Sequence, residues 1–350
     1  MKIHEKYMLR CIQLGKKGLG STAPNPMVGS VIVYQNQIIG EGFTSPYGEA
    51  HAEVNAINSV KDKSLLSKST IYVTLEPCSH YGKTPPCADL IVEHQIPEVV
   101  IGLKDPHSKV SGKGIEKLKT AGVKVNVGVL EDECRRHHQR FLTYQEKKRP
   151  YVILKWAQTL DGFIAPDTSK REKNPQPFWI TNTYSKQLVH QWRSEEQAIL
   201  VGTQTVLEDN PKLTTRNWKG KDPIRVVLDR SLKIPKGFHV LDNSVKTIVL
   251  TEVNNKSKYL DDIAYEVVDF SLPLATLICK VLYTYNITSI LVEGGSRTIQ
   301  TFIAENLWDE ARVFNGASIF EDGISAPKLS AEPKENNNIL SDTLSIYTND

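Results

Sequence analysis

The sequence has few cysteines, no long apolar run and almost no excess of charge. Five of its 350 residues are cysteine, and an odd, sparse number in a long chain argues against a disulfide framework and for a reducing compartment. The longest apolar runs, such as Val99–Leu103, have the length of a strand, which argues against a membrane-spanning helix. Met1–Gly18 lacks the apolar core of a signal peptide and is expected to be a short amphipathic helix. We therefore expect a cytoplasmic protein with no membrane partner.

The small net charge also bears on the partners of the protein. A formal net charge of +3 gives no support to a nucleic-acid partner. A nucleic-acid binder needs a basic groove with interleaved aromatic side chains, and the basic residues cluster only at Lys147–Arg149. Hydrophobic residues make up 40% and charged residues 24% of the chain, as in ordinary globular proteins. Because 350 residues are too many for one ordinary core, we expect two domains.

Two series of alternating strands and helices flank a polar segment, and this alternation predicts an α/β fold. The polar segment, Asp132–Lys148, is expected to form a connecting helix that ends before Pro150. We place the boundary near Lys147–Pro150, with one domain over residues 1–148 and the other over 149–350. The strands predicted in the first domain are Val28–Tyr34, Ile38–Gly42, Thr70–Leu75, Val99–Leu103 and Val123–Val127. The helices predicted there are Ala52–Val60, Ala88–His94 and Gly114–Ala121.

The second domain is expected to repeat the alternation without repeating the sequence. Its predicted strands are Tyr151–Ala157, Ala198–Val201, Ile224–Leu228, Thr247–Thr251 and Ser289–Val292. Its predicted helices are Ser185–Glu195, Leu274–Tyr285 and Ser296–Glu305. The tail from Ala331 is rich in Asn, Glu and Ser and is expected to be loosely ordered in part, although Thr343–Tyr347 has the pattern of an edge strand.

One histidine and two cysteines stand in an order that is typical of a catalytic zinc site. His51-Ala52-Glu53 is followed by Cys78 and then by Cys87. Three protein ligands leave the fourth tetrahedral position of zinc to water, and bound zinc lowers the pKa of that water to roughly 7. Glu53 lies at a predicted helix start, where its carboxylate can exchange protons with the water without binding the metal. The order therefore predicts hydrolytic deamination.

The predicted helix starts support this ligand set. Cys87 follows Pro85-Pro86 and opens an apolar helical run, where the helix dipole favours thiolate over thiol. A structural zinc site would need a fourth protein ligand, for which His80 is the candidate, and we prefer the open, three-ligand interpretation. A single buried histidine or cysteine is more often structural, so the prediction depends on the complete ordered set.

Several segments resemble the bifunctional riboflavin-biosynthesis deaminase/reductase family. In the first half these are Thr22–Gly29, His51–Glu53 and Thr74–Cys87. Eight residues separate the two cysteines, as in that family, whereas two separate them in the general deaminase pattern. In the second half the similar segments are Lys148–Gly162, Trp179–Asn182, Gly202–Arg216 and Val292–Gly295. The resemblance extends from residue 1 to about residue 315.

The resemblance implies a fold and two reactions. The first domain would have a three-layer cytidine-deaminase-like fold, and the second an α/β fold similar to dihydrofolate reductase. With Zn²⁺, the first would hydrolyse the 2-amino group of 2,5-diamino-6-(5-phosphoribosylamino)pyrimidin-4(3H)-one. With NADPH, the second would reduce the ribosyl group of the product to ribityl phosphate. The partners would be these small pyrimidine nucleotides, and the sequence leaves a homo-oligomer open.

Carried over residue by residue, the resemblance also implies the site residues. Glu53 would be the catalytic residue, and zinc would be bound by His51, Cys78 and Cys87. The substrate-binding residues would be Asn25, Lys83, Lys155, Arg193, Leu213, Arg216 and Glu293. The cofactor-binding residues would be Ala157, Trp179, Thr205, Asp209, Gly295, Ser296, Arg297, Thr298, Ile299, Gln300 and Thr301. Two positions depart from the family, since Thr44 stands where a histidine is frequent and Pro177 where a serine is usual.

The second site has weaker support from the residues themselves. Glu293–Ser296 lies between an apolar strand and a helix, where backbone amides can approach a phosphate, but a plain glycine turn explains the pattern equally. Arg193 and Arg216 suit a sugar phosphate. Two other interpretations therefore stay open. One is a monofunctional deaminase with an inactive, partner-binding second domain, and the other is a nucleic-acid-editing deaminase, which the charge balance disfavours.

Overall fold

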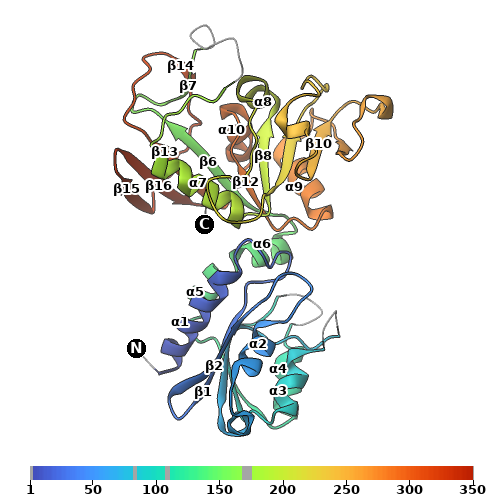
Figure 1. Ribbon diagram of the computed structural model, residues 1–350, viewed down its shortest axis with the longest axis vertical. Coiled ribbons are helices and arrows are strands. Elements are labelled where there is room, and N and C mark those ends of the chain that lie inside the picture. The colour runs from blue at the N-terminus through green and yellow to red at the C-terminus, as the bar shows by residue number, and fades with distance from the viewer. Residues whose placement is uncertain (1–2, 82–84, 107–110, 168–175, 350) are drawn as a thin grey trace. The chain divides into compact units, whose positions relative to one another are not determined.

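The chain folds into two compact units, Met1–Lys148 and Arg149–Asp350, which are described separately (Figure 1). The structure is a computed structural model that describes residues 3–81, 85–106, 111–167 and 176–349. Over these ranges, each helix is too short or too polar to span a lipid bilayer.

Unit 1 is built on a mixed five-stranded sheet with the order β2-β1-β3-β4-β5. β1 (Gly29–Tyr34) pairs antiparallel with β2 (Gln37–Phe43) and with β3 (Thr70–Leu75). β4 (Glu98–Leu103) and β5 (Lys124–Val127) continue the sheet parallel to β3. It follows that β2, β3, β4 and β5 all run in one direction, so that the loops after them lie along the same edge of the sheet.

Helices cover both faces of this sheet, which gives unit 1 three layers (Figure 1). One side carries α1 (Ile3–Gly15) and α5 (Glu131–His137), and the other carries α2 (Ala52–Ser59), α3 (Cys87–Glu93) and α4 (Lys113–Thr120). The central strands are buried on both faces for this reason. The unit is completed by α6 (Gln139–Lys147) and by the short 3₁₀ helices η1 (Lys16–Gly18) and η2 (Lys63–Lys68).

Unit 2 is built on a nine-stranded sheet with the order β11-β10-β9-β8-β12-β6-β13-β16-β15. The first seven in this order are parallel, and the last two pairings are antiparallel. The parallel strands are β6 (Tyr151–Gln158), β8 (Ala198–Gly202), β9 (Ile224–Leu228), β10 (Thr247–Thr251), β11 (Ala264–Val267), β12 (Ser289–Val292) and β13 (Glu310–Asn315). The antiparallel ones are β15 (Glu335–Ile339) and β16 (Asp342–Thr348), while β7 (Phe163–Pro166) pairs with β14 (Gly323–Ser325) in a separate small sheet.

Both faces of the large sheet are buried under helices. α9 (Leu274–Thr284) and α10 (Ser296–Ala304) contribute Leu282 and Phe302 to the core on one face. α7 (Thr183–Glu195) covers part of the other face, where Trp192 stacks on Phe314 with ring centroids 5.4 Å apart. α8 (Thr203–Asp209) directly follows β8, and η4 (His239–Leu241) and η5 (Lys256–Lys258) lie in the loops around β10.

Two predicted features of the chain differ from the structure. The single connecting helix is two helices, α5 and α6, with the break at His138. Both His137 and His138, at the break, are buried. The tail after Ala331 is an ordered hairpin, in which the predicted edge strand is the inner strand β16 and the edge is β15.

The core of unit 2 can be tested by a mutation whose effect is read from a signal of unit 2 alone. All five tryptophans lie after residue 150, so tryptophan fluorescence reports the unfolding of unit 2 alone. Phe302 is fully buried in α10, and Phe302→Ala is expected to lower the free energy of unfolding measured by this signal in urea by about 3–5 kcal/mol. Leu272→Ala, at a half-exposed position, is the control and should change it by less than about 0.5 kcal/mol. An unchanged midpoint for Phe302→Ala would contradict the assigned core.

Candidate metal centre and candidate cofactor cavity

Three potential metal ligands come from the loops along one edge of the unit 1 sheet. His51 ends the loop after β2 and is the N-cap residue of α2. Cys78 lies in the loop after β3, and Cys87 is the first residue of α3. Because β2 and β3 run in the same direction, their loops leave the sheet at one edge, and residues far apart in sequence meet there.

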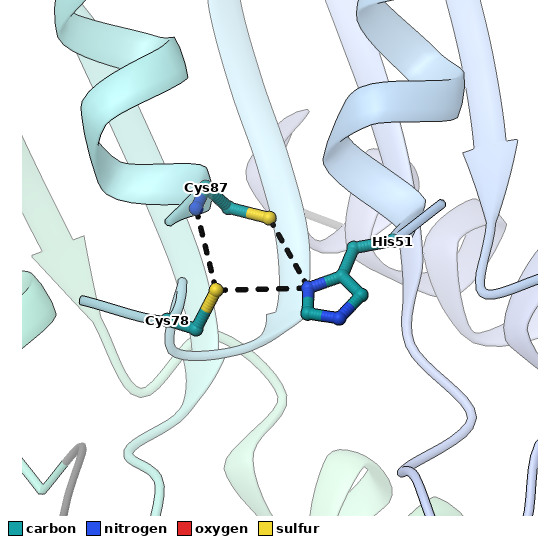
Figure 2. A group of neighbouring side chains, drawn as sticks. All are labelled: His51, Cys78 and Cys87. Carbon is teal, nitrogen blue, oxygen red and sulfur yellow. Dashed lines mark hydrogen bonds between the residues drawn. The ribbon is translucent and has the colours of Figure 1, made fainter. Parts of the chain in front are cut away.

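The three side chains converge on a common centre (Figure 2). Nδ1 of His51 lies 3.6 Å from Sγ of Cys78 and 3.4 Å from Sγ of Cys87, and the three ligand atoms all lie within 4.8 Å of one another. Tetrahedral zinc with ligands at its usual bond lengths holds them roughly 3.3–3.8 Å apart. Both the donor types and the spacing therefore fit zinc. His80 is exposed and outside this group, so the described residues supply three ligands and leave a position open.

The pKa values of the two cysteines in the ligand group are shifted in opposite directions. Hydrogen bonding to Cys87, together with His51, lowers the pKa of Cys78 to about 4. The neighbouring Cys78, together with burial, raises the pKa of Cys87 well above its usual value. The backbone N–H of Cys87, the first of α3, donates to Sγ of Cys78 at 3.3 Å. The helix start thus stabilises a thiolate at Cys78, whereas the sequence analysis expected this effect at Cys87.

Glu53 lies in the first turn of α2, two residues after His51, and is 4% exposed. Burial and the nearby Cys78 raise the pKa of this carboxyl to about 7. A carboxyl group with such a pKa both accepts and releases a proton near neutral pH, which is the property that a general acid–base residue needs.

The other residues predicted around the metal have different outcomes. Asn25 is half-buried, and its backbone N–H donates to the carbonyl of Thr22 at 2.9 Å. Thr44 is buried, and its Oγ1 accepts a hydrogen bond from the N–H of Val28 at 3.1 Å. This threonine therefore supports the chain next to β1 and presents no imidazole. Lys83 lies outside the described residues.

Unit 2 contains a cavity of about 1240 Å³ at the carboxyl ends of its parallel strands. Its wall includes Lys155 and Ala157 from β6, Gly202 from β8, Leu228 from β9 and Glu293 just after β12. Ligands of open α/β sheets bind at this end of the strands. Common small-molecule sites measure roughly 300–1,000 Å³, so the cavity has room for a large cofactor and a substrate together.

A buried ionic cluster forms part of the cavity wall. Nε and Nη2 of Arg193 each donate to a different carboxylate oxygen of Glu293 at 2.8 Å, and Nζ of Lys155 lies 3.9 Å from the same carboxylate. Burial would raise the pKa of Glu293, but the charges of Arg193 and Lys155 outweigh it and lower the pKa to about 2. Burial, with repulsion from Arg193, lowers the pKa of Arg216. The cluster has an excess of positive charge, which suits an anionic ligand.

Glycines keep the backbone around the start of α10 open. Gly295 has a positive φ of 55°, and a Cβ there would lie 3.1 Å from Oγ1 of Thr205. At Gly202 a Cβ would lie 2.6 Å from Oγ1 of Thr298. The turn therefore requires glycine at 295, and a side chain at 202 would displace Thr298. Helix starts with an accessible backbone bind phosphate groups, so this part of the cavity fits a nucleotide cofactor.

Most of the residues predicted for the second site line this one cavity, and three do not. Ile299 is buried in the core of unit 2, Gln300 exchanges hydrogen bonds with the backbone of Lys328, and Oγ1 of Thr301 donates to the carbonyl of Arg297. The predicted residues in the cavity wall are Lys155, Ala157, Trp179, Arg193, Thr205, Asp209, Leu213, Arg216, Glu293, Gly295, Ser296, Arg297 and Thr298. Pro177, at the other departure from the family, lines it as well.

The sequence analysis did not identify His190, which lines the cavity from α7 and is 4% exposed. Burial, with repulsion from Arg193 and Arg216, lowers the pKa of His190 to about 4. Its imidazole is thus neutral at physiological pH and adds no further positive charge to the cluster. The available signal was its position three residues before Arg193, which places both side chains on the same face of a helix.

Two family models and several complete proteins match the chain. The cytidine and deoxycytidylate deaminase zinc-binding region matches residues 1–103, and the RibD C-terminal domain matches residues 150–320. The riboflavin biosynthesis protein RibD of Aquifex aeolicus is 40% identical over 331 residues, which cover 94% of this chain and 91% of that protein. The RibD of Synechocystis is 39% identical over 329 residues, covering 92% of this chain and 86% of that protein.

Solved structures agree with the matches in sequence. The diaminohydroxyphosphoribosylaminopyrimidine deaminase/5-amino-6-(5-phosphoribosylamino)uracil reductase of Thermotoga maritima is similar with a TM-score of 0.88 and 40% identity, over 98% of each chain. Acinetobacter baumannii RibD is similar with a TM-score of 0.89 and 32% identity, over 99% of this chain and 98% of that one. The similarity therefore includes both units.

The ligand group predicts that the metal depends on Cys78. The purified chain should hold about one zinc per chain, and Cys78→Ser should lose it, because a serine hydroxyl replaces a thiolate ligand. Elemental analysis of the dialysed proteins measures this. Cys279→Ser, at a buried free cysteine of unit 2, is the matched control and should retain the metal. Stoichiometric zinc in Cys78→Ser would exclude the proposed ligand set.

The ionic cluster predicts how Glu293 titrates. Arg193→Met leaves Lys155 beside the carboxylate of Glu293 but removes the closest cation. The pKa of Glu293 should therefore rise by about 1–3 units from about 2. The pKa of Glu293 is lower in the folded than in the unfolded chain, so its charged form stabilises unit 2 at neutral pH. This stabilisation is lost on acidification. In the variant it is lost at a higher pH. The carboxyl ¹³C shift of Glu293 against pH measures the change. Arg193→Lys keeps the charge and should shift it less; equal titration in all three proteins would refute the account.

Proposed function

The chain belongs to the RibD family of riboflavin biosynthesis proteins, and on that premise we propose that each unit performs one of the two reactions of the family. It is a bifunctional enzyme, a zinc-dependent deaminase and an NADPH-dependent reductase. We assign deamination to unit 1, residues 1–148, and reduction to unit 2, residues 149–350. The observation that carries the assignment is the separation of the residues: the zinc ligand set lies in unit 1 and the ionic, glycine-lined cavity in unit 2.

Deamination replaces an amino group of the pyrimidine by an oxygen from water. His51, Cys78 and Cys87 would hold zinc, which when bound acts as a Lewis acid that makes water a nucleophile at neutral pH. The carboxylate of Glu53 accepts the proton that water gives up and delivers it to the departing nitrogen, so that ammonia leaves. The buried position of Glu53 in the first turn of α2, two residues after His51, puts one carboxyl group beside the ligand set for both transfers.

Reduction opens the ribosyl ring of the deaminated product. Gly295 and the start of α10 would hold NADPH, which would serve as the hydride donor for the sugar carbon attached to nitrogen. The ring oxygen must gain a proton when its bond to that carbon breaks, and we assign this transfer to Lys155, because burial lowers the pKa of its ammonium group. Glu293 holds Lys155, and Arg193 holds Glu293. Arg216 lines the cavity and is the residue that we assign to the sugar phosphate.

The substrate and the compartment follow from the same proposal. The substrate of unit 1 is the diaminopyrimidine nucleotide, 2,5-diamino-6-(5-phosphoribosylamino)pyrimidin-4(3H)-one, and that of unit 2 is its deaminated product. The five cysteines form no disulfide with one another, which supports a reducing compartment, and we propose the cytoplasm. The alternative, a deaminase whose second unit is inactive, predicts no oxidation of NADPH under any condition.

Variants of the two units are expected to separate the reactions. Glu53→Gln keeps the metal ligands but removes the proton carrier, so ammonia release should fall by about 10²–10⁴-fold. Given the deaminated intermediate directly, this variant should oxidise NADPH at nearly the parent rate. Lys155→Ala should release ammonia normally and leave the ribosyl group unreduced. Ammonia assays, NADPH absorbance and product masses measure these outcomes.

One result with these variants would contradict the assignment of the two reactions to separate units. If Glu53→Gln remains folded and zinc-loaded but no longer reduces the supplied intermediate, the reactions share a site or are strictly coupled. If the parent oxidises no NADPH with the intermediate present, the inactive second unit becomes the better account.

A further inference from the structure

Glu76 is a buried carboxylate that has no part in the proposed chemistry. It follows β3 directly, stands two residues before Cys78 and is 4% exposed. Its carboxylate accepts four backbone hydrogen bonds, two at each oxygen. Oε1 accepts from Gly114 at 3.0 Å and Ile115 at 3.2 Å, and Oε2 from Gly112 at 3.0 Å and Asp105 at 3.3 Å.

The donors are the loop after β4 and the first turn of α4. Gly112 is the N-cap residue of α4 and offers no side chain to its free N–H groups, so Glu76 performs the capping from another segment. Only a carboxylate accepts at both oxygens. An amide of the same shape would accept at one side and turn an N–H₂ group toward two backbone donors at the other.

The same contact fixes the chain on the way to the metal ligand. The N–H of Glu76 donates to the carbonyl of Leu103 at 2.9 Å, and Gly114 packs so closely on Pro77 that a Cβ there would lie 2.1 Å from the carbonyl oxygen of Pro77. On the other side of the loop, the carbonyl of Cys78 accepts from the N–H of Ala88 at 3.1 Å. The loop segment 76–78 is thus held between the starts of α4 and α3.

We propose that Glu76 is a positioning residue of the metal centre: its four hydrogen bonds to the start of α4 hold the loop so that Sγ of Cys78 meets His51 and Cys87. The inference rests on the proposed function in that it takes this group to bind zinc. Residues behind the ligands of a metal site orient them, and their loss typically weakens metal binding 10–100-fold. Glu76 acts in this way through the backbone of the loop and not through a hydrogen bond to a ligand side chain.

The test compares the zinc affinity of the full-length parent with that of Glu76→Gln, by competition with a chromophoric chelator. We expect the dissociation constant for zinc to rise about 10–100-fold. Glu98→Gln is the matched control, since Glu98 is a partly buried carboxylate of the same sheet that binds Thr70, Asn126 and Lys124 at the opposite end of β3 and β4. This control should stay within about threefold of the parent.

Cobalt(II) provides a readout of position that a loss of stability alone would not change. Bound to two thiolates and an imidazole it is coloured, and the visible bands depend on the arrangement of the ligands. We expect Glu76→Gln to shift these bands when saturated with cobalt, and Glu98→Gln to leave them unchanged. Gly114→Ala is a second variant for the case that Glu76→Gln does not fold. It presses on the carbonyl of Pro77 while favouring the helix, and it should weaken zinc binding in the same way.

The outcomes separate this inference from the proposed function. If the parent itself binds no zinc, the proposed function fails, whatever Glu76 does. If the parent binds zinc but a folded Glu76→Gln or Gly114→Ala binds it equally tightly with unchanged cobalt bands, the positioning role is overturned. The role is also overturned if Glu98→Gln weakens zinc binding as much as Glu76→Gln, because then any lost carboxylate in the sheet has the same effect.

Discussion

The site of unit 1 depends on one constraint, which is that two sulfurs and an imidazole lie close together in a largely buried position. Both cysteines cannot ionise side by side without a cation, and the pKa of Cys78 is accordingly lowered while that of Cys87 is raised. A divalent metal removes this conflict, because it allows both sulfurs to be thiolates. Strands of one direction, two helix starts and the buried carboxylate of Glu76 all lie at the edge of the sheet where the three ligands meet.

Unit 2 also buries charged side chains, but there the excess charge is positive. Part of its cavity wall holds the cations of Lys155, Arg193 and Arg216 around the carboxylate of Glu293. The bidentate contact to Arg193 gives Glu293 a fixed direction, and the remaining positive charge stays available to an anionic ligand. A neutral His190 avoids a further cation in this wall. In both units the site therefore lies at the carboxyl ends of strands and has an excess of charge of one sign. A ligand of the opposite charge would balance this excess.

The sequence predicted the strands that are buried on both faces, because Thr70–Leu75 and Ile224–Leu228 are rich in apolar and β-branched residues, although Arg225 interrupts the second run. It failed where burial depends on distant partners. β15 contains Glu335 and three asparagines and has no strand pattern of its own; it pairs because β16 presents an edge beside β13. The break between α5 and α6 at His138 was not predicted either.

For the candidate site, the sequence by itself determined which residues are able to bind zinc. Local signals accompany His51, Cys78 and Cys87, namely a following glutamate, a preceding strand and a helix start. Such signals can be recognised in the sequence because they depend only on neighbouring residues. Only the tertiary structure showed that the first N–H of α3 donates a hydrogen bond to Sγ of Cys78. It alone placed Glu76 against α4, and His190 and Arg193 of α7 against Glu293 in one cavity wall. These contacts join residues that lie far apart in the chain, and the physical reason is the parallel sheet, which brings the ends of separate strands to one edge.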